Sequence, residues 1–194
     1  SAKIDIIPDR IEAGTFLIAG ALLGEITLEN VNKNHLLSVV LKLKDTGSEI
    51  VESGNSLTIL PSDIINPVDI QTAVYPGFPT DLQAQWVAMM SIAKGSSVIT
   101  DNVYNDRFSH IPELNRLGAK IKVDHNSAWI KGVESLKGAQ VMSTDIRASA
   151  ALIIGGLVAD GITEVQRVYH IDRGYEKIEE KFSEIGAKIY RESA

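Results

Sequence analysis

One pattern of residues recurs three times along this chain of 194 residues, and it constrains the fold more than any single motif. Each copy opens with an acidic residue, continues through an almost wholly apolar segment, and stops at a glycine followed closely by β-branched residues. The apolar segments read FLIAGALLG, WVAMMSIAKG and AALIIGGLVADG. The opening residues are Asp9, Asp81 and Asp145, and the closing glycine follows 14 to 16 residues later. Self-similarity at a nearly fixed period is typical of repeat architectures.

After its glycine, each copy continues with a short strand, an amphipathic helix and a final strand. In the first copy, Leu36, Val39 and Leu43 recur at helical spacing, so one face of that helix is buried. The earlier helix of each copy is apolar all round, which requires burial on every side. We therefore predict an α/β fold, an inside-out α/β barrel of three β-α-β-α-β-type repeats with pseudo-threefold symmetry. It forms one domain over residues 1–194, with repeats at about 4–66, 67–138 and 139–194.

The third copy lacks a part that the first two contain. In the first two, the final strand (SEIVES, AKIKVD) is followed by a turn and a returning strand (SLTIL, SAWIKGV), in which we expect Trp129 to pack. The third copy has the final strand AKIYRE, at 187–192, without a returning one. Because an unpaired strand edge is a liability, we expect a strand from elsewhere in a longer chain, or from another molecule, to complete it.

Composition excludes several classes of function. A formal net charge of -6 and a pI near 5.2 argue against a general nucleic-acid surface, which needs a dense field of Lys and Arg. Without cysteine the chain offers no disulfide or thiolate, and its four histidines lack metal-binding spacing. Neither a signal peptide at Ser1–Pro8 nor an apolar stretch of about 20 residues is present, so we predict a cytoplasmic protein without membrane span, metal or cofactor.

Repeats related by rotation place the starts of the three apolar helices on one face, where free backbone N–H groups favour anions. Acidic and arginine side chains fall in these connections: Asp9, Arg10, Asp81, Arg107, Asp145, Arg147 and Arg173. Arginines there can bind phosphate or carboxylate through bidentate contacts, and Asp81 can take a proton from a hydroxyl. The alternative is that the aspartates are ordinary helix N-caps and the arginines form weak surface pairs.

The loop before Asp81 reads YPGFPTD, at 75–81. Its prolines make it rigid, and its aromatic residues beside an acid suit the wall of a binding site. The same features also fit a stiff connection with no role in binding.

Four long strings are similar to the motifs of one enzyme family: YPGFPTDLQAQ, DNVYNDRFSHIPEL, STDIRASAALIIGGL and YHIDRGYEKIEEK. The chain thereby resembles the UDP-N-acetylglucosamine enolpyruvyltransferase family from IPDRIEAGTF onward, over about the C-terminal half of its two-domain protein. The resemblance implies two similar domains that close on their substrates, and transfer of enolpyruvyl from phosphoenolpyruvate to the 3-hydroxyl of UDP-N-acetylglucosamine. Phosphate is released, in a step of peptidoglycan precursor synthesis. It implies that the absent N-terminal domain is a partner and that its first segment completes the third repeat.

The resemblance also implies roles for particular residues. Asp81 would contact the sugar 3-hydroxyl and accept its proton, and Arg173 would meet phosphoenolpyruvate. The residues along the nucleotide sugar would be Val103 and Tyr104, where the family more often has phenylalanine at the second position. Arg107, Asp145 and Arg147 would line the site and support its closure, and the catalytic residues would be Asp81, Arg147 and Arg173. Asp9 and Arg10 match a pair near the other domain with less defined roles.

The family's catalytic cysteine and further phosphate-binding cations belong to the absent half, so we predict no turnover from this chain alone. Two alternatives remain open on the sequence. One is half of the related shikimate-pathway enolpyruvyltransferase, which the YPGFPTD and TDIRASA strings disfavour. The other is a catalytically silent domain that binds a ligand or a partner half.

Overall fold

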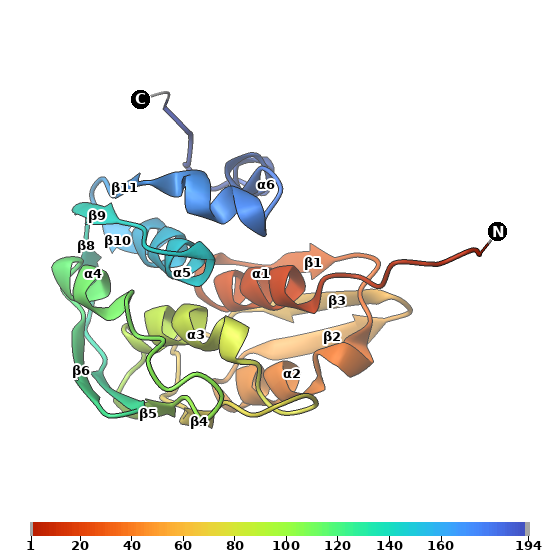
Figure 1. Cartoon of the computed structure of the whole chain (residues 1–194), viewed down its shortest axis with the longest axis horizontal. Coiled ribbons are helices and arrows are strands. Elements are labelled where there is room, and N and C mark those ends of the chain that lie inside the picture. The colour runs from red at the N-terminus through yellow and green to blue at the C-terminus, as the bar shows by residue number, and fades with distance from the viewer. Residues whose placement is uncertain (1, 193–194) are drawn as a thin grey trace.

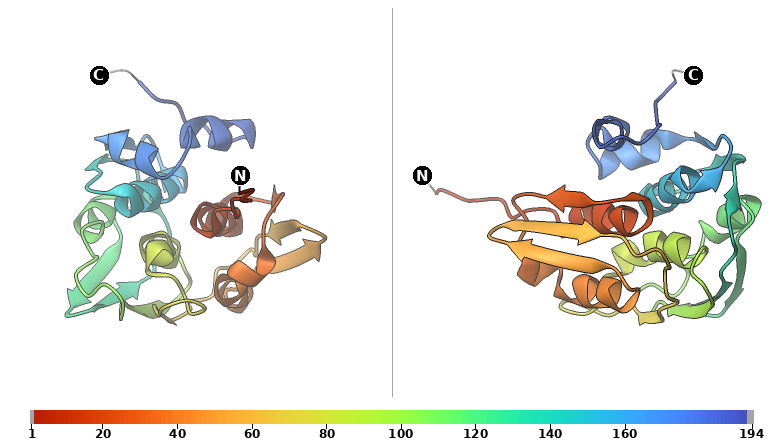
Figure 2. Two further views of the ribbon diagram at one scale, coloured as in Figure 1. Left: turned by 45° about the vertical axis from the view of Figure 1, so that its right-hand side comes forward. Right: turned by 180° about the vertical axis from the view of Figure 1, so that it is seen from behind.

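Three helices of almost entirely apolar sequence lie side by side at the centre of the protein (Figure 1). They are α1 (Arg10–Leu23), α3 (Gln83–Met90) and α5 (Ile146–Leu157). The structure is a computed structural model that describes residues 2–192. Every residue of α3 is buried, and α1 and α5 contact α3 as well as one another. The prediction of buried helices is confirmed for all of α3 and for residues 14–21 of α1 and 148–155 of α5, whereas Leu23 at the end of α1 is 41% exposed. Strands and further helices lie around the three helices (Figure 2).

A glycine allows α1 to lie close to the start of α3. A Cβ on Gly14 in α1 would clash with Leu82 Cδ1, just before α3, unless that side chain moved. One polar cluster lies between the helices. Thr15 Oγ1 and Tyr175 Oη lie 2.8 Å apart, and Gln85 Nε2 donates to both at 3.1 and 3.2 Å. These bonds tie α1 and α3 to the third repeat within the core.

The first and second repeats share one strand arrangement. The first consists of β1 (Ile26–Leu28), η1 (Lys33–His35), α2 (Leu37–Asp45), β2 (Glu49–Ser53) and β3 (Ser56–Leu60). The second consists of β4 (Ile70–Gln71), η2 (Thr80–Leu82), β5 (Ser96–Thr100), α4 (Ile111–Arg116), β6 (Lys120–Asp124) and β7 (Ser127–Lys131), besides α3. In both, the returning strand lies antiparallel between the other two, in the orders β1-β3-β2 and β5-β7-β6, and β4 adds a parallel strand beside β5.

The expectation that Trp129 packs is wrong. Its neighbours Ala128 and Ile130 are buried, whereas Trp129 is 55% exposed. Successive side chains of a strand point to opposite faces, and the two neighbours occupy the inner face of β7. Trp129 therefore faces solvent.

The third repeat departs most from the prediction. It consists of β8 (Leu136–Lys137), β9 (Gln140–Met142), β10 (Ala159–Asp160), β11 (Glu164–Gln166), η3 (Val168–Arg173) and α6 (Ile178–Glu184), besides α5. The pairs β8–β10 and β9–β11 are parallel. The predicted strand at 187–192 is absent, and Tyr190 is 75% exposed. A strand forms by pairing, and in the first two repeats the neighbour at this position is the returning strand, for which the described third repeat has no equivalent.

The segment before α1 also extends away from the body of the molecule (Figures 1 and 2), with Ile4 and Ile6 exposed. Over residues 2–192, no helix combines the length and the apolar character that crossing a bilayer would take.

Candidate functional site

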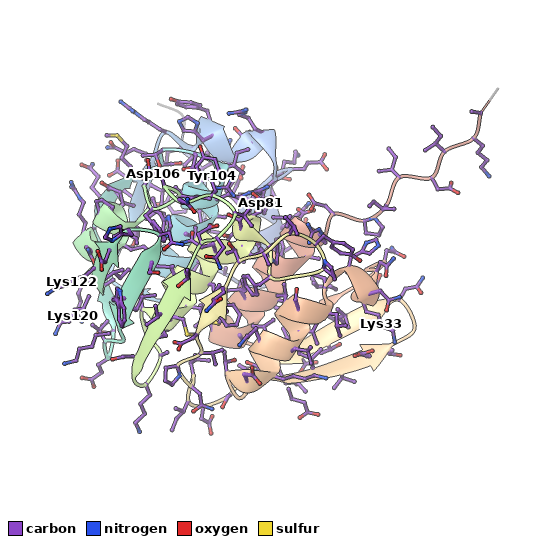
Figure 3. The ribbon with its side chains drawn as sticks, turned by 60° about the horizontal axis from the view of Figure 1, so that its bottom comes forward. Lys33, Asp81, Tyr104, Asp106, Lys120 and Lys122 are labelled. Carbon is purple, nitrogen blue, oxygen red and sulfur yellow. The ribbon has the colours of Figure 1, made fainter. Side chains whose placement is uncertain are left out.

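A cavity of about 380 Å³ lies where the second and third repeats meet at the starts of α3 and α5. We call it the arginine cavity. Its lining residues are Asp81, Tyr104, Asp106, Arg107, Ser109, Asp145, Ile146, Arg147 and Arg173. The structure thus gathers six of the residues that the sequence singled out. Asp81, Tyr104 and Asp106 lie together in the upper part of the view in Figure 3, away from Lys33 at the right.

Asp81 holds two arginines at one oxygen. Its Oδ1 accepts a hydrogen bond from Arg107 Nη1 at 2.7 Å and another from Arg147 Nε at 3.1 Å. The three side chains are between 20% and 35% exposed, so the ion pairs are partly shielded from water. Charge-assisted bonds in such surroundings are stronger than those of a surface pair. The pairs join the loop before α3, the loop before α4 and the first turn of α5.

The three aspartates at equivalent positions of the repeats do different things. Asp9 caps α1 by accepting from the backbone N–H of Ile11 at 2.7 Å. Asp145 caps α5 by accepting from the backbone N–H groups of Arg147 and Ala148 at 2.8 and 2.9 Å. For these two, the interpretation as N-caps is confirmed. Asp81 caps no helix, so its carboxylate is directed at cations instead.

The charge state of Asp81 follows from its neighbours. Burial raises the pKa of this carboxyl, but the Arg147 cation and hydrogen bonds from Arg107 and Arg147 lower it further than burial raises it. The pKa therefore lies below its ordinary value, and Asp81 is ionised at neutral pH.

Asp145 is anchored on both oxygens. Besides the capping bonds at Oδ1, its Oδ2 accepts from Ser109 Oγ at 2.9 Å. Burial raises the pKa of Asp145, but the hydrogen bonds from Ala148, Ser109 and Arg147 outweigh this effect and lower it. Its part in the cavity is to fix the start of α5, and with it the side chain of Arg147.

Arg173 and Tyr104 are both exposed in the lining of the cavity. Arg173 is the last residue of η3, and within the stretch 2–192 its guanidinium enters no ion pair. Tyr104 is 56% exposed and carries the Arg107 guanidinium 5.0 Å from its ring centre. An exposed guanidinium and an exposed aromatic ring in one cavity are an arrangement that an anionic ligand with a flat group can use.

Three of the predicted residues lie outside the lining. Val103 is 44% exposed next to Tyr104, and Asp9 and Arg10 stand at the start of α1. Arg10 packs over the ring of Tyr75, with its guanidinium 5.2 Å from the ring centre.

The aromatic residues of the loop at 75–81 do not form the cavity wall that we expected. Phe78 is buried against Trp86, with ring centres 5.2 Å apart, and Tyr75 contacts Arg10. The loop matters for the cavity through Asp81 at its end.

The sequence interpretation did not single out Asp106, Ser109 or Ile146, which also line the cavity. Asp106 and Ser109 flank predicted residues in the segment NDRFSH, and Ile146 stands between two of them. Proximity in sequence to Arg107 and Asp145 was the signal available for finding them.

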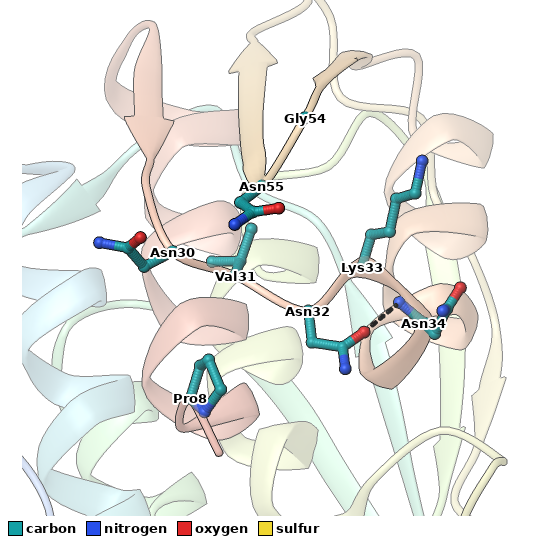
Figure 4. A pocket seen from close by; sticks show the side chains of 8 residues that line it. All are labelled: Pro8, Asn30, Val31, Asn32, Lys33, Asn34, Gly54 and Asn55. Carbon is teal, nitrogen blue, oxygen red and sulfur yellow. Dashed lines mark hydrogen bonds between the residues drawn. The ribbon is translucent and has the colours of Figure 1, made fainter. Parts of the chain in front are cut away.

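A larger cavity, of about 520 Å³, lies elsewhere, at the first repeat (Figure 4). Its residues are Pro8, Asn30, Val31, Asn32, Lys33, Asn34, Gly54 and Asn55. Its one cation, Lys33, is paired with Glu52 at 2.8 Å. Size alone does not make a site for an anion, whereas the smaller cavity has three arginines. We therefore place the candidate site at the arginine cavity.

The chain is similar to known proteins over most of its length. Residues 1–182 match the family described as EPSP synthase (3-phosphoshikimate 1-carboxyvinyltransferase). The chain is 54% identical over 191 residues to UDP-N-acetylglucosamine 1-carboxyvinyltransferase 2 of Carboxydothermus hydrogenoformans. The matched region covers 97% of this chain and 46% of that protein. It is also 54% identical to the corresponding protein of Prosthecochloris aestuarii, with coverages of 95% and 44%. The chain spans about half the length of the curated relatives it matches.

Solved structures show the same fold. The enolpyruvyl transferase NikO from Streptomyces tendae superimposes with a TM-score of 0.85 at 26% identity, over 96% of this chain and 45% of that one. EPSP synthase from Acinetobacter baumannii gives a TM-score of 0.65 at 18% identity, with coverages of 84% and 40%. The predicted resemblance to UDP-N-acetylglucosamine carboxyvinyltransferases is confirmed by the sequence identities. This chain belongs to the EPSP synthase (3-phosphoshikimate 1-carboxyvinyltransferase) family.

Proposed function

We propose that this chain is the C-terminal half of a UDP-N-acetylglucosamine 1-carboxyvinyltransferase. The reaction transfers enolpyruvyl from phosphoenolpyruvate to the sugar 3-hydroxyl and releases phosphate, as a step in peptidoglycan precursor synthesis. The observation that carries the proposal is Asp81 held between Arg107 and Arg147 in a cavity that also contains Arg173. The names of the most similar relatives support the same activity.

The proposal extends to the architecture. The three repeats, at about 4–66, 67–138 and 139–194, form a single domain with an inside-out, pseudo-threefold arrangement around α1, α3 and α5. The contacts among these helices and the shared strand order of the first two repeats support it.

The arginines suit the charges of the substrates. Phosphoenolpyruvate carries a phosphate and a carboxylate, both of which planar guanidinium groups bind through paired hydrogen bonds. Arg173 and Arg147 bind phosphoenolpyruvate and stabilise the negative charge that develops during transfer. Tyr104, Val103 and Arg107 lie along the nucleotide sugar, and Asp145 holds Arg147 in place through the start of α5.

Asp81 is the proposed acceptor for the proton of the sugar hydroxyl. While both arginines bind its Oδ1, its pKa is low and it is a weak base. An anionic substrate that draws Arg147 away removes the largest attraction on this carboxylate. The pKa of Asp81 then rises, because the Arg147 cation no longer favours the charged form. Substrate binding would thus prepare the base.

The half-site is incomplete by itself. The cavity is bounded only by the second and third repeats, and Tyr104 and Arg173 are exposed. We propose that the half of the relatives that this chain does not cover, here called the complementary half, closes over it. Exclusion of water strengthens the electrostatic interactions within such a site. A segment of the longer protein also pairs with residues 187–192 and completes the third repeat.

Phosphate release tests the proposal. The chain alone, the complementary half alone and their mixture are each given phosphoenolpyruvate with UDP-N-acetylglucosamine or with shikimate 3-phosphate. The proposal predicts release only in the mixture and only with the nucleotide sugar. Consumption of shikimate 3-phosphate would assign the chain to the branch that the family description names. Tight binding of UDP-N-acetylglucosamine without any release would indicate a catalytically silent binding domain.

A further inference from the structure

Asp101 is a fully buried carboxylate that belongs to no ion pair within residues 2–192. It follows β5 directly and lies outside the lining of the arginine cavity. Its side chain accepts four hydrogen bonds. Thr72 Oγ1 donates to Oδ1 at 2.6 Å, Thr80 Oγ1 donates to Oδ2 at 2.6 Å, and the backbone N–H groups of Val103 and Tyr104 donate to Oδ1 at 3.0 and 2.9 Å.

The four bonds join two loops that carry the candidate site. The two N–H donors belong to the loop with Val103 and Tyr104, two and three residues after Asp101. The two hydroxyl donors come from the ends of the segment 72–80, immediately before Asp81. A turn that only closed on itself would use the N–H donors alone. Here one carboxylate holds both loops.

The connection reaches the ion pairs of the cavity in one further step. Arg107 Nη1 lies 3.4 Å from Thr80 Oγ1 and 2.7 Å from Asp81 Oδ1. A shift of Thr80 therefore moves Asp81 relative to Arg107 and Tyr104. Burial of a carboxylate is costly unless hydrogen bonds satisfy it, and four such bonds define one geometry.

We propose that Asp101 is a positioning residue for the nucleotide-sugar site: it fixes the distance between Asp81 and the segment 103–107 without touching the substrate. The inference rests on the proposed function for its ligand, UDP-N-acetylglucosamine. The four hydrogen bonds that Asp101 accepts, here called the clamp, are a property of the chain and can be measured without any ligand.

Three variants separate the parts of the clamp. Asp101→Ala removes all four bonds, and Asp101→Asn keeps the shape and one oxygen acceptor. Thr80→Val removes the bond from Thr80 to Asp101, together with the long contact from Arg107 to the same hydroxyl, and leaves the N–H bonds of Val103 and Tyr104. Asp69→Asn is the matched control, because Asp69 accepts from the Val98 N–H at 2.7 Å at the opposite end of the same strand pair.

Amide hydrogen exchange at Val103 and Tyr104, followed by NMR on the chain alone, measures the clamp. Exchange should be faster by about tenfold or more in Asp101→Ala, less so in Asp101→Asn, and unchanged in Thr80→Val and the control, since bonds to a charged acceptor are the stronger class. Calorimetric titration and steady-state kinetics with the complementary half present measure the consequence. Asp101→Ala should weaken UDP-N-acetylglucosamine binding about tenfold and Thr80→Val about threefold, with the KM for phosphoenolpyruvate nearly constant.

The outcomes are distinct. If wild type binds the nucleotide sugar and both Asp101→Asn and Thr80→Val bind it equally well, the inference is overturned. These two variants decide the matter if Asp101→Ala does not fold. If wild type does not bind, the proposed function fails, whereas unchanged exchange at Val103 and Tyr104 in Asp101→Asn would refute the clamp independently.

Discussion

Arg147 Nε donates to Asp81 Oδ1 across 3.1 Å, although 66 positions of sequence separate the two residues. The bond joins the loop before α3 to the first turn of α5, and Arg107 binds the same oxygen. At the equivalent positions of the other repeats, Asp9 and Asp145 cap helices. Asp81 caps no helix and instead forms ion pairs with two arginines.

Replacement of Asp81 by asparagine tests its chemical role. Asparagine keeps an oxygen that can accept from the arginines but cannot take a proton at neutral pH. Asp81→Asn, combined with the complementary half, should release phosphate at least about 100-fold more slowly, with a modest change in affinity for the nucleotide sugar. Asp63→Asn, on an exposed loop, serves as the control. Full activity of Asp81→Asn would rule out its role as proton acceptor.

Arg173 offers a test of anion binding. Lysine keeps the positive charge but loses the planar fork that binds carboxylate or phosphate bidentately. Arg173→Lys should raise the KM for phosphoenolpyruvate about tenfold and leave that for UDP-N-acetylglucosamine nearly unchanged. The matched control is Arg116→Lys, which changes a side chain that is 60% exposed in a surface pair with Glu113. Equal effects of the two changes would argue against a specific role for Arg173.

His110 predicts a pH dependence of stability. Burial lowers the pKa of this imidazole to about 4, Asp145 raises it in part, and Arg107 lowers it. An unfolded histidine has a pKa near 6.5, so between about pH 6.5 and 4 the unfolded chain binds more protons than the folded one. The stabilisation from the neutral, buried form is therefore complete above pH 6.5 and is lost as the pH falls toward 4.

Chemical unfolding at pH 7, 6, 5 and 4 measures this slope, to which His110 contributes at most about 1.4 kcal/mol per pH unit. His110→Gln should flatten the slope over that range. His125→Gln should leave it unchanged, because the His125 side chain is 91% exposed. An identical slope in wild type and His110→Gln would contradict the prediction.

The polar cluster in the core predicts a change in stability. Tyr175→Phe removes the hydroxyl that lies 2.8 Å from Thr15 Oγ1 and accepts from Gln85 Nε2. The free energy of unfolding should fall by about 1 kcal/mol, the usual net value of a buried hydrogen bond. Tyr190→Phe is the control, because Tyr190 is 75% exposed. Equal denaturation midpoints for both variants would show that the cluster adds nothing to stability.

Much of this fold could be predicted because the repeats duplicate the signal. All-round apolar sequences place α1, α3 and α5 in the interior, and the amphipathic helices α2, α4 and α6 end two residues before Gly47, Gly118 and Gly186. The strand at 187–192 failed because sequence pattern reports a preference for extended backbone, whereas a strand also requires a partner. The prediction that Trp129 packs was wrong because the sequence pattern did not indicate which face of β7 points inward.

The site could be predicted in composition but not in detail. The arginines come together because the starts of α3 and α5, the loop before α4 and the end of η3 meet at one cavity, which depends on the topology of the folded chain. Asp9 and Asp145 cap α-helices that begin at the next residue. Asp81 instead lies within the 3₁₀ turn Thr80–Leu82, and the sequence pattern did not predict this difference. Asp101 could not be assigned from sequence, since its partners come from loops that meet only in the folded chain.

The most direct test of the central claim is to locate the bound nucleotide sugar by NMR. Backbone amide shifts of the isotope-labelled chain are recorded during titration with UDP-N-acetylglucosamine, with the unlabelled complementary half present. The changes that depend on the nucleotide sugar should cluster at Asp81, Tyr104, Arg107 and Arg173. Changes centred instead on the cavity around Asn32 and Asn55, with the arginine cavity unaffected, would contradict the account.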